Sequence, residues 1–158
     1  MRADDAARLL AVFGDAELMT AFETPPFDRG QMNAWVQRNL AHQERFGYGL
    51  FTVVLRESNE VIGDCGLETI QVEGQGETEL GYDLRRDLWS RGLATEAADA
   101  VVRHAFGELG LRHLVSLVRP HNRRSSRVAE KIGMRRERRL ERGGVAYVVY
   151  AMERTDRV

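Results

Sequence analysis

The stretch from Glu77 to Leu109 constrains the fold of this chain more than any other, because two hydrophobic periods meet within it. Up to Leu84, apolar and polar residues alternate, which predicts a β-strand with one buried face. After the turn that contains Gly92, the apolar residues recur at helical spacing: Ala94, Ala97, Ala98, Val101, Val102, Ala105, Phe106 and Leu109. A strand that ends in a turn and opens a helix presents unpaired N–H groups at the positive end of the helix dipole. The junction therefore predicts an anion site.

A helix is predicted near the start of the chain. Asp4 or Asp5 is placed to cap it, and its apolar face carries Leu9, Leu10 and Phe13. The pair Gly14-Asp15 interrupts this helix. A short helical turn is expected next, with the apolar residues Leu18, Met19 and Phe22.

A second helix is predicted after the break at Pro25-Pro26. Asp28 and Gln31 have the spacing of a capping box at its start, and Gly47 is expected to end it. Its apolar stripe consists of Met32, Trp35, Val36, Leu40 and Phe46. We expect Trp35 and Phe46 to lie in the core, although these two helices can also wall a substrate cleft.

Strands are predicted on either side of the loop at residues 57–60, over Leu50–Arg56 and Val61–Val72. Gly63 and Gly66 within the second strand suggest a bulge or a close approach of another backbone. With the loop at 73–76 and the strand at Glu77–Leu84, these segments predict an antiparallel meander of three strands.

Downstream of the long helix, the pattern predicts a buried strand at His113–Arg119 and a helix that Asn122 caps and Gly133 ends. A hairpin of Met134–Arg142 and Val145–Met152 follows. The strand at 113–119 should pair in parallel with the strand at 77–84, because a helix connects them. We therefore predict a single α/β (α+β) domain over residues 1–158, with a mixed, mostly antiparallel sheet flanked by helices.

Charge and composition narrow the classes of function. Residues 1–84 hold 6 basic and 15 acidic residues, a net charge of −9, whereas residues 85–158 hold 17 and 9, a net charge of +8. The basic half is where an anionic cofactor is expected. The basic residues look scattered and lack interleaved aromatics, so no nucleic-acid partner is expected. The sequence has no apolar run long enough for a membrane span and no apolar signal region. It has one cysteine and no Cys/His cluster with the spacing of a metal site, so we expect no metal. With no membrane span and no signal region in the sequence, we also expect no membrane partner and a cytoplasmic location.

Two motifs stand in order along the chain. The first comprises Glu79-Leu80-Gly81-Tyr82 and then residues 88–97, LWSRGLATEA; the second comprises residues 120–125, PHNRRS, and 128–134, VAEKIGM. Together they resemble the GNAT (Gcn5-related) N-acetyltransferases, specifically the branch that acetylates ribosomal-protein N-termini. The resemblance runs from about Ala3 to Glu153. That family normally has a strand before its first helix, and this chain starts almost at that helix, so we expect the first strand to be missing.

The resemblance implies acetyl-CoA as co-substrate. Backbone groups near Leu84 and Arg85 would bond the pantetheine arm. The N–H groups of the loop would hold the pyrophosphate, and the residues concerned are Arg91, Gly92, Leu93, Ala94 and Thr95. Asn122 and Ser125 would touch the cofactor from the other side. Trp89 stands where the family loop commonly has Gln or Arg, as it often does in the ribosomal-protein branch. Arg85, Arg86 or Arg91 can add charge-assisted bonds to a phosphate.

Acetyl transfer needs a neutral amine and a proton for the leaving thiolate. Glu79 is the first candidate for the base and Glu68 the second; Glu79 can equally be a structural partner of an Arg. Ser125 is the candidate proton donor, with a purely helix-stabilising role as the alternative. The more distant candidates for the donor are Tyr82, Tyr147 and Tyr150. Cys65 lies in an apolar strand, where a core thiol is the usual finding rather than a nucleophile.

We therefore expect an N-acetyltransferase that moves an acetyl group directly from acetyl-CoA to a primary amine, either a protein N-terminus or a small molecule. A non-catalytic acyl-CoA-binding module of the same fold is the alternative. A nucleotide-phosphate binder such as a kinase is weaker, since no Gly-x-x-x-x-Gly-Lys-Ser/Thr pattern exists. The resemblance also implies a homodimer, and the sequence does not identify the acceptor amine.

Overall fold

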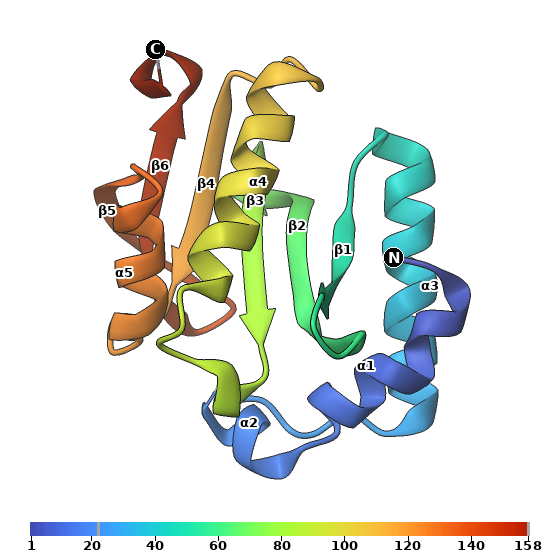
Figure 1. Ribbon diagram of the computed structural model, residues 1–158. Coiled ribbons are helices and arrows are strands. Elements are labelled where there is room, and N and C mark those ends of the chain that lie inside the picture. The colour runs from blue at the N-terminus through green and yellow to red at the C-terminus, as the bar shows by residue number, and fades with distance from the viewer. Residues whose placement is uncertain (22, 158) are drawn as a thin grey trace. The chain divides into compact units, whose positions relative to one another are not determined.

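The computed structural model describes residues 1–21 and 23–157 (Figure 1); Phe22, expected in an apolar helical turn, lies outside them. The helices are α1 (Ala6–Phe13), α2 (Ala16–Ala21), α3 (Arg29–Phe46), α4 (Leu93–Gly107) and α5 (Arg123–Lys131). The strands are β1 (Leu50–Leu55), β2 (Glu60–Val72), β3 (Gln75–Leu84), β4 (His113–Val118), β5 (Arg135–Arg142) and β6 (Val145–Glu153). Short 3₁₀ turns are η1 (Ala3–Asp5), η2 (Arg86–Leu88) and η3 (Arg154–Arg157). The predicted order of elements is confirmed.

The six strands form one sheet in the order β1-β2-β3-β4-β6-β5. β3 and β4 pair in parallel, with Glu79 opposite Val115, as the helical connection predicted. The pairs β1–β2, β4–β6 and β5–β6 are antiparallel, so the predicted mixed, mostly antiparallel sheet flanked by helices is confirmed. No strand precedes α1 among the described residues, in agreement with the expected absence of a first strand. None of the helices described is both long and apolar enough to span a bilayer.

The chain divides into two compact units. The first contains residues 1–66 and 82–94, and the second contains residues 67–81 and 95–158. In the first unit α1 packs on α3, and the side chains of Leu9, Met32 and Val36 are fully buried. Removing such a side chain from water contributes about 1.5–3 kcal/mol. The prediction of a single domain over residues 1–158 stays a prediction.

Two glycines of β2 hold the first unit together by close backbone contact. A Cβ at Gly63 would lie 1.9 Å from the carbonyl oxygen of Asp83, and one at Gly66 would lie 2.3 Å from that of Gly49. The β1–β2 register shifts beside Gly63, between Val53 and Val54. Both predicted features, the bulge and the close approach, are therefore present.

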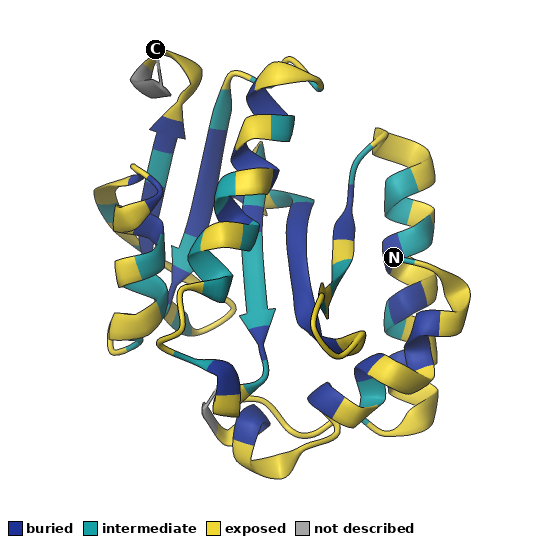
Figure 2. Cartoon of the chain, in the orientation of Figure 1, coloured by how far each residue is buried: buried dark blue, intermediate teal, exposed yellow. Residues whose placement is uncertain are grey.

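The second unit buries the strands that α4 and α5 cover. Leu114, Val149 and Met152 are at most 1% exposed, and Figure 2 shows β4 mostly buried, whereas α5 carries many exposed and half-buried residues. The hairpin β5–β6 turns at Gly143-Gly144, where the sequence predicted it. The outer strand β5 is mostly exposed.

Local capping signals are confirmed at two helices. Asp28 Oδ1 accepts the N–H of Gln31 at 2.8 Å, and Gln31 Oε1 accepts the N–H of Asp28 at 2.9 Å, which completes the capping box of α3. Asn122 Oδ1 accepts the N–H of Ser125 at 3.1 Å at the start of α5. Each such cap contributes about 1 kcal/mol.

The expected cap of the first helix is wrong. Asp5 stands at the N-cap of α1, but its carboxylate makes no capping bond. Instead it accepts the N–H of Arg2 at 2.8 Å and the hydroxyl of Thr52 at 2.7 Å. Burial raises the pKa of Asp5, but these hydrogen bonds and the nearby positive charges outweigh it, so the net pKa is lowered. Asp5 therefore fastens η1 to β1.

The expectation that Phe46 belongs to the core is also wrong. It is the last residue of α3 and is 38% exposed. Its ring packs on the rings of His42, at 4.6 Å between centroids, and Tyr48, at 6.2 Å. Trp35 is half-buried and packs on the core of the first unit, as expected.

Candidate active site

The turn after β3 is fastened at both ends. The N–H of Arg85 donates to the carbonyl oxygen of Ile62 at 2.7 Å, so pairing with β2 continues to the end of β3. The indole Nε1–H of Trp89 donates to the carbonyl oxygen of Leu84 at 2.7 Å. Leu84 and Leu88 are buried with Ile62 in a small core against which Leu93 and Ala94 pack. The turn therefore has a defined conformation.

Two residues of this turn have left-handed backbone conformations. Ser90 has φ 63° and Gly92 has φ 84°, and α4 begins at Leu93. Alternating backbone handedness turns successive N–H groups toward one side, which makes an anion-binding concavity. The first turn of α4 adds its own N–H groups and the positive end of the helix dipole. A Cβ at Gly92 would meet no described atom within 4 Å, so the space beside this backbone is open. The turn therefore has the backbone geometry that an anion site needs, and the binding of an anion there stays a prediction.

Arg85 and Arg86 do not present free charges. Arg85 bonds both carboxylate oxygens of Asp87, at 2.7 and 3.1 Å, and lies 3.6 Å from Glu60. Arg86 forms an ion pair with Glu17 of α2. The hydrogen bond and charge of Arg85 lower the pKa of Asp87, and those of Asp87 raise the pKa of Arg85. These carboxylates already neutralise two of the three Arg side chains expected near a phosphate.

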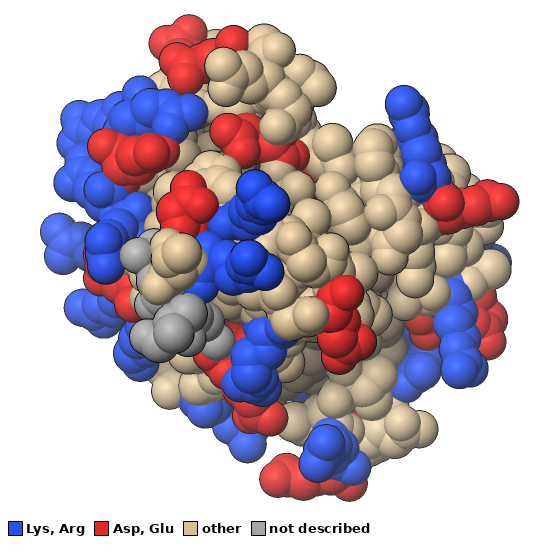
Figure 3. Space-filling model, turned by 90° about the horizontal axis from the view of Figure 1, so that it is seen from above, with Lys and Arg blue, Asp and Glu red and all other residues tan. Residues whose placement is uncertain are grey.

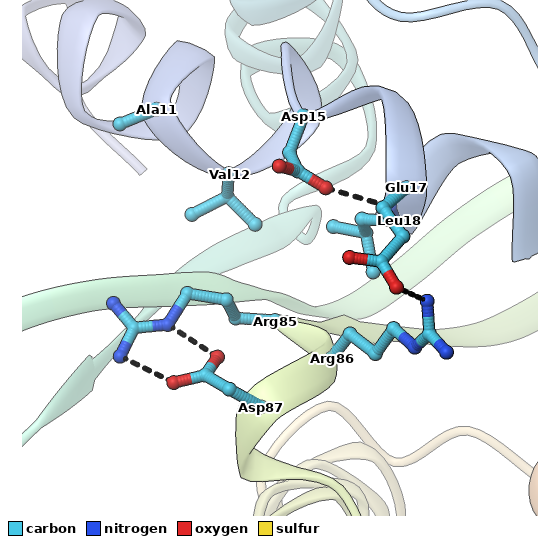
Figure 4. A pocket seen from close by; sticks show the side chains of 8 residues that line it. All are labelled: Ala11, Val12, Asp15, Glu17, Leu18, Arg85, Arg86 and Asp87. Carbon is cyan, nitrogen blue, oxygen red and sulfur yellow. Dashed lines mark hydrogen bonds and ion pairs between the residues drawn. The ribbon is translucent and has the colours of Figure 1, made fainter.

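A cavity of about 480 Å³ lies beside these ion pairs in the first unit (Figure 4). Its apolar wall comes from α1 and α2 and its charged wall largely from η2 and the residue before it. The lining residues are Ala11, Val12, Asp15, Glu17, Leu18, Arg85, Arg86 and Asp87. Asp15 uses its Oδ1 to accept the N–H of Leu18 at 2.7 Å, which caps α2. α1 and α2 thus line this cavity, whereas α3, the second of the two helices expected to wall a substrate cleft, supplies none of its lining residues.

Glu79 lies in the second unit, at the register position where β3 pairs with β4. Its Oε1 accepts the backbone N–H of Leu117 at 3.3 Å, and the side chain is half-buried. Two residues earlier on the same strand face, Glu77 lies 3.1 Å from His113 Nδ1. The Glu79 carboxylate thus has a backbone amide as one partner, and its pairing with an Arg stays a prediction.

Asn122 and Ser125 are brought together by the cap of α5, in which Ser125 is the third residue of the helix. The side chain of Ser125 is half-buried. Thr95, the third residue of α4, is half-buried as well. The expected cap is confirmed, whereas the roles of these three residues toward a cofactor stay predictions.

The remaining candidates have other surroundings. Tyr150 is 4% exposed and donates its hydroxyl to Glu130 Oε1 at 3.3 Å, while Tyr147 lies under the guanidinium of Arg119 at 5.1 Å. Cys65 is buried, and burial, with the charges of Asp64 and Asp83, raises the pKa of its thiol far above the ordinary value. A thiol held in its neutral form is a poor nucleophile, in line with the core role expected for it. Glu68 and Tyr82 are half-buried.

Sequence reasoning missed the contacts that shape the turn. The hydrogen bond from Trp89 to Leu84 gives the indole a structural role, and no local sequence pattern predicts this bond. The pairing of Arg85 with Asp87 had a signal, since the two residues are only two positions apart. Among residues 1–21 and 23–157, no three His, Cys, Asp or Glu side chains are grouped as metal ligands.

Comparison with known proteins identifies the family. Residues 1–135 match the family model described as the acetyltransferase (GNAT) domain. The uncharacterized protein YkkB of Bacillus subtilis (strain 168) is 32% identical over 147 residues, which cover 93% of this chain and 85% of YkkB.

Two solved structures share the fold at lower identity. One is the ribosomal-protein-S5-alanine acetyltransferase of Vibrio fischeri, with a TM-score of 0.79, 17% identity and coverage of 99% of this chain and 91% of that one. The other is the aminoglycoside acetyltransferase AAC(6′)-Ib in complex with coenzyme A, with a TM-score of 0.81, 17% identity and coverage of 99% and 93%. The two scaffolds fit about equally well, so the fold does not distinguish their acceptors. Since residues 1–135 match the family model, and the chain has a strand, a turn with left-handed residues and a helix in the order described, this chain belongs to the GNAT acetyltransferase family.

Proposed function

We propose that this protein is an N-acetyltransferase that transfers an acetyl group directly from acetyl-CoA to a primary amine. The observation that carries the proposal is the turn Ser90–Ala94, whose left-handed residues and helix start converge N–H groups beside open space. Coenzyme A carries a pyrophosphate, which such a turn binds well. The complex of AAC(6′)-Ib with coenzyme A, on the same fold, supports this choice of ligand.

In the proposed complex, the N–H groups of residues 91–95 hold the pyrophosphate. The Arg85 N–H is already bonded to Ile62 and the Leu84 carbonyl to Trp89, so the N–H of Leu84 is the group we assign to the pantetheine arm. Asn122 and Ser125 contact the cofactor as the family resemblance implies. Arg91 is exposed and forms no ion pair with a carboxylate among residues 1–21 and 23–157, so we assign it the cationic contact.

The proposed chemistry has one attack and two proton transfers. The neutral amine nitrogen attacks the thioester carbonyl carbon, and the carbon–sulfur bond breaks as the new amide bond forms. Glu79 accepts the proton that the amine loses and returns it to solvent, while Ser125 relays a proton from solvent to the thiolate of coenzyme A and so keeps its hydroxyl. An alkyl amine is mostly protonated at neutral pH, which is why a nearby carboxylate base helps. The acceptor is a protein N-terminus or a small amine.

The decisive experiment measures thiol release from acetyl-CoA with a panel of peptide N-termini, polyamines and aminoglycosides. We expect time-dependent release with at least one amine. Thermal stabilisation by acetyl-CoA without release on any amine would instead identify a non-catalytic acyl-CoA-binding module.

The base is tested separately with Glu79→Gln. If the carboxylate accepts the amine proton, turnover falls roughly 10²–10⁴-fold while the Kd for acetyl-CoA is unchanged. Glu77→Gln, two residues away on the same strand face, is the matched control and should retain turnover. Equal turnover of Glu79→Gln and the wild type would remove Glu79 from the mechanism.

A further inference from the structure

A strongly basic surface extends from α5, which carries Ser125 of the proposed active site, onto β5, to which no part of that site is assigned. Residues 123–142 hold nine basic and three acidic residues, a net charge of +6, in a chain whose net charge is −1. The rest of the chain therefore carries −7. We call this surface the basic edge, and its cations are Arg123, Arg124, Arg127 and Lys131 of α5 and Arg135, Arg136, Arg138, Arg139 and Arg142 of β5.

The fold gathers these side chains at one margin of the second unit. β5 is the last strand in the sheet order and α5 packs on it, and Figure 3 shows Lys and Arg side chains crowded on that side of the molecule. Arg136 pairs in register with Tyr150, whose hydroxyl bonds Glu130 of α5, so Arg136 points to the face that α5 covers. Arg139 shares that face, and Arg142 lies on the opposite one. Cations therefore line both faces of the edge strand.

Most of this charge is not neutralised within the protein. Arg138 lies 3.3 Å from Glu73 and also pairs with Glu137. Six other cations of the basic edge have no carboxylate within 4 Å among the described residues, and they are Arg123, Arg127, Lys131, Arg136, Arg139 and Arg142. All six side chains are exposed. Crowded like charges repel each other, and a bound polyanion relieves that repulsion.

The shape and composition of the basic edge select the kind of polyanion. An eight-residue strand spans roughly 26 Å, which is long for a single phosphate and matches a linear chain of phosphates. The exposed large apolar residues that the structure shows are Phe46, Phe51 and Val54, all in the first unit. The basic edge thus lacks the apolar anchors that a protein interface core needs, and also the apolar side chains that an amphipathic membrane anchor inserts.

We propose that the basic edge binds the phosphate backbone of a nucleic acid without reading its sequence. Electrostatic contacts to phosphates suffice for such binding. The proposal departs from the expectation drawn from the sequence, where these residues look scattered, because the fold places helix and strand cations side by side. It does not rest on the proposed acetyltransferase activity.

The test measures fluorescence anisotropy of a labelled 20-nucleotide RNA, single-stranded and duplex, against the full chain at several salt concentrations. Contacts to four to six phosphates predict a slope of about −3 to −5 in log affinity against log salt. The combined variant Arg136→Gln, Arg139→Gln and Arg142→Gln should bind at least about tenfold more weakly and lower that slope by about 2 to 3. The corresponding Arg→Lys variant keeps the charge and should keep the binding.

The matched control removes three exposed Arg from α3, as Arg29→Gln, Arg38→Gln and Arg45→Gln. It changes the net charge equally and should bind like the wild type. Equal weakening of both Gln variants, or no RNA binding by the wild type at 50 mM salt, would overturn the proposal. So would binding to poly-L-glutamate or to vesicles of anionic phospholipid that is as tight as binding to RNA. Melting curves of each variant show that the comparison is made on folded protein.

Discussion

The glycines of β2 and the glycine of the turn before α4 have opposite surroundings. At Gly63 and Gly66 the backbone of a neighbouring segment occupies the place of a Cβ, with oxygen atoms 1.9 and 2.3 Å away. At Gly92 nothing described lies within 4 Å, and only the positive φ of 84° favours glycine. The first pair is explained by packing. Gly92 is left with a backbone conformation that aims N–H groups at open space.

This difference separates positions that serve the fold from positions that serve a ligand. Close packing leaves no alternative at β2, because protein interiors tolerate little added volume. Gly92 itself adopts the left-handed region without strain, but the neighbouring Ser90 holds φ 63° without being glycine. Such strain often marks a binding site. The contrast can be tested by substitution, starting with the largest expected effect.

Gly63→Ala should destabilise the protein most. The added methyl group would overlap the backbone at Asp83, and the expected loss is more than about 3 kcal/mol, or a melting temperature lower by roughly 6–12 °C. Gly107→Ala is the control, since Gly107 lies in α4 with no described atom within 4 Å of its Cβ position and should tolerate alanine. Urea unfolding measures both. A loss below about 1 kcal/mol for Gly63→Ala would show that β2 and β3 can separate without cost.

Gly92→Ala should lose ligand affinity out of proportion to stability. Alanine in the left-handed region costs about 1–2 kcal/mol, and a shifted turn should weaken acetyl-CoA binding at least about tenfold, or 1.4 kcal/mol. Gly74→Ala is the matched control, because Gly74 has φ 81° and equally open surroundings in the β2–β3 hairpin. Calorimetric titration with acetyl-CoA distinguishes the two. If both variants bind acetyl-CoA alike, the turn is not the cofactor site.

Thr52→Val tests the packed region by pH. The lowered pKa of Asp5 means that this carboxylate adds stability above its unfolded pKa, about 3.9, and that this stability is lost as pH falls through the folded pKa. Removing the Thr52 hydroxyl should therefore cost about 1.5 kcal/mol at pH 7 and less at pH 2. Urea unfolding at both pH values measures this difference. A penalty that is equal at the two pH values would contradict the role of the ionised carboxylate.

Ser90→Gly should have the smallest effect and the opposite sign. Ser90 holds φ 63° without being glycine, so relief of strain should raise stability by up to about 1 kcal/mol. We expect the acetyl-CoA affinity to stay within about twofold of the wild type, a difference of about 0.4 kcal/mol. Glycine makes the turn only slightly more flexible. A large loss of affinity would show that the rigidity of Ser90 itself matters.

Signals that act within a few residues could be predicted from the sequence. The capping box of Asp28 and Gln31, the cap at Asn122 and the hairpin at Gly143-Gly144 all depend on local geometry, and the structure has each of them. The parallel pairing of β3 with β4 follows from connectivity. The turn at Gly92 also follows from local geometry, because a glycine between a strand and a helix favours a left-handed turn there.

Features that depend on distant partners could not be predicted. Asp5 has the right position for a helix cap, yet its carboxylate accepts a hydrogen bond from the hydroxyl of Thr52, 47 residues away. Phe46 fits the apolar stripe of α3, but the stripe is covered only where α1 packs, and the last residue remains exposed. Arg86 is committed to Glu17, 69 residues away. The cavity beside Arg85 and Arg86 has the same character, because it is formed by segments that share no sequence motif.

The hydrogen bond from Trp89 to Leu84 gives the protein a built-in optical probe. The chain has two tryptophans, and the other, Trp35, packs between Phe13 and Phe27 at 6.0 and 6.5 Å. A Trp35→Phe variant would therefore leave one tryptophan, Trp89, whose indole is hydrogen-bonded to the end of β3. Its emission spectrum should respond when the turn is occupied, so unlabelled ligands can be titrated by light alone, without knowledge of the acceptor.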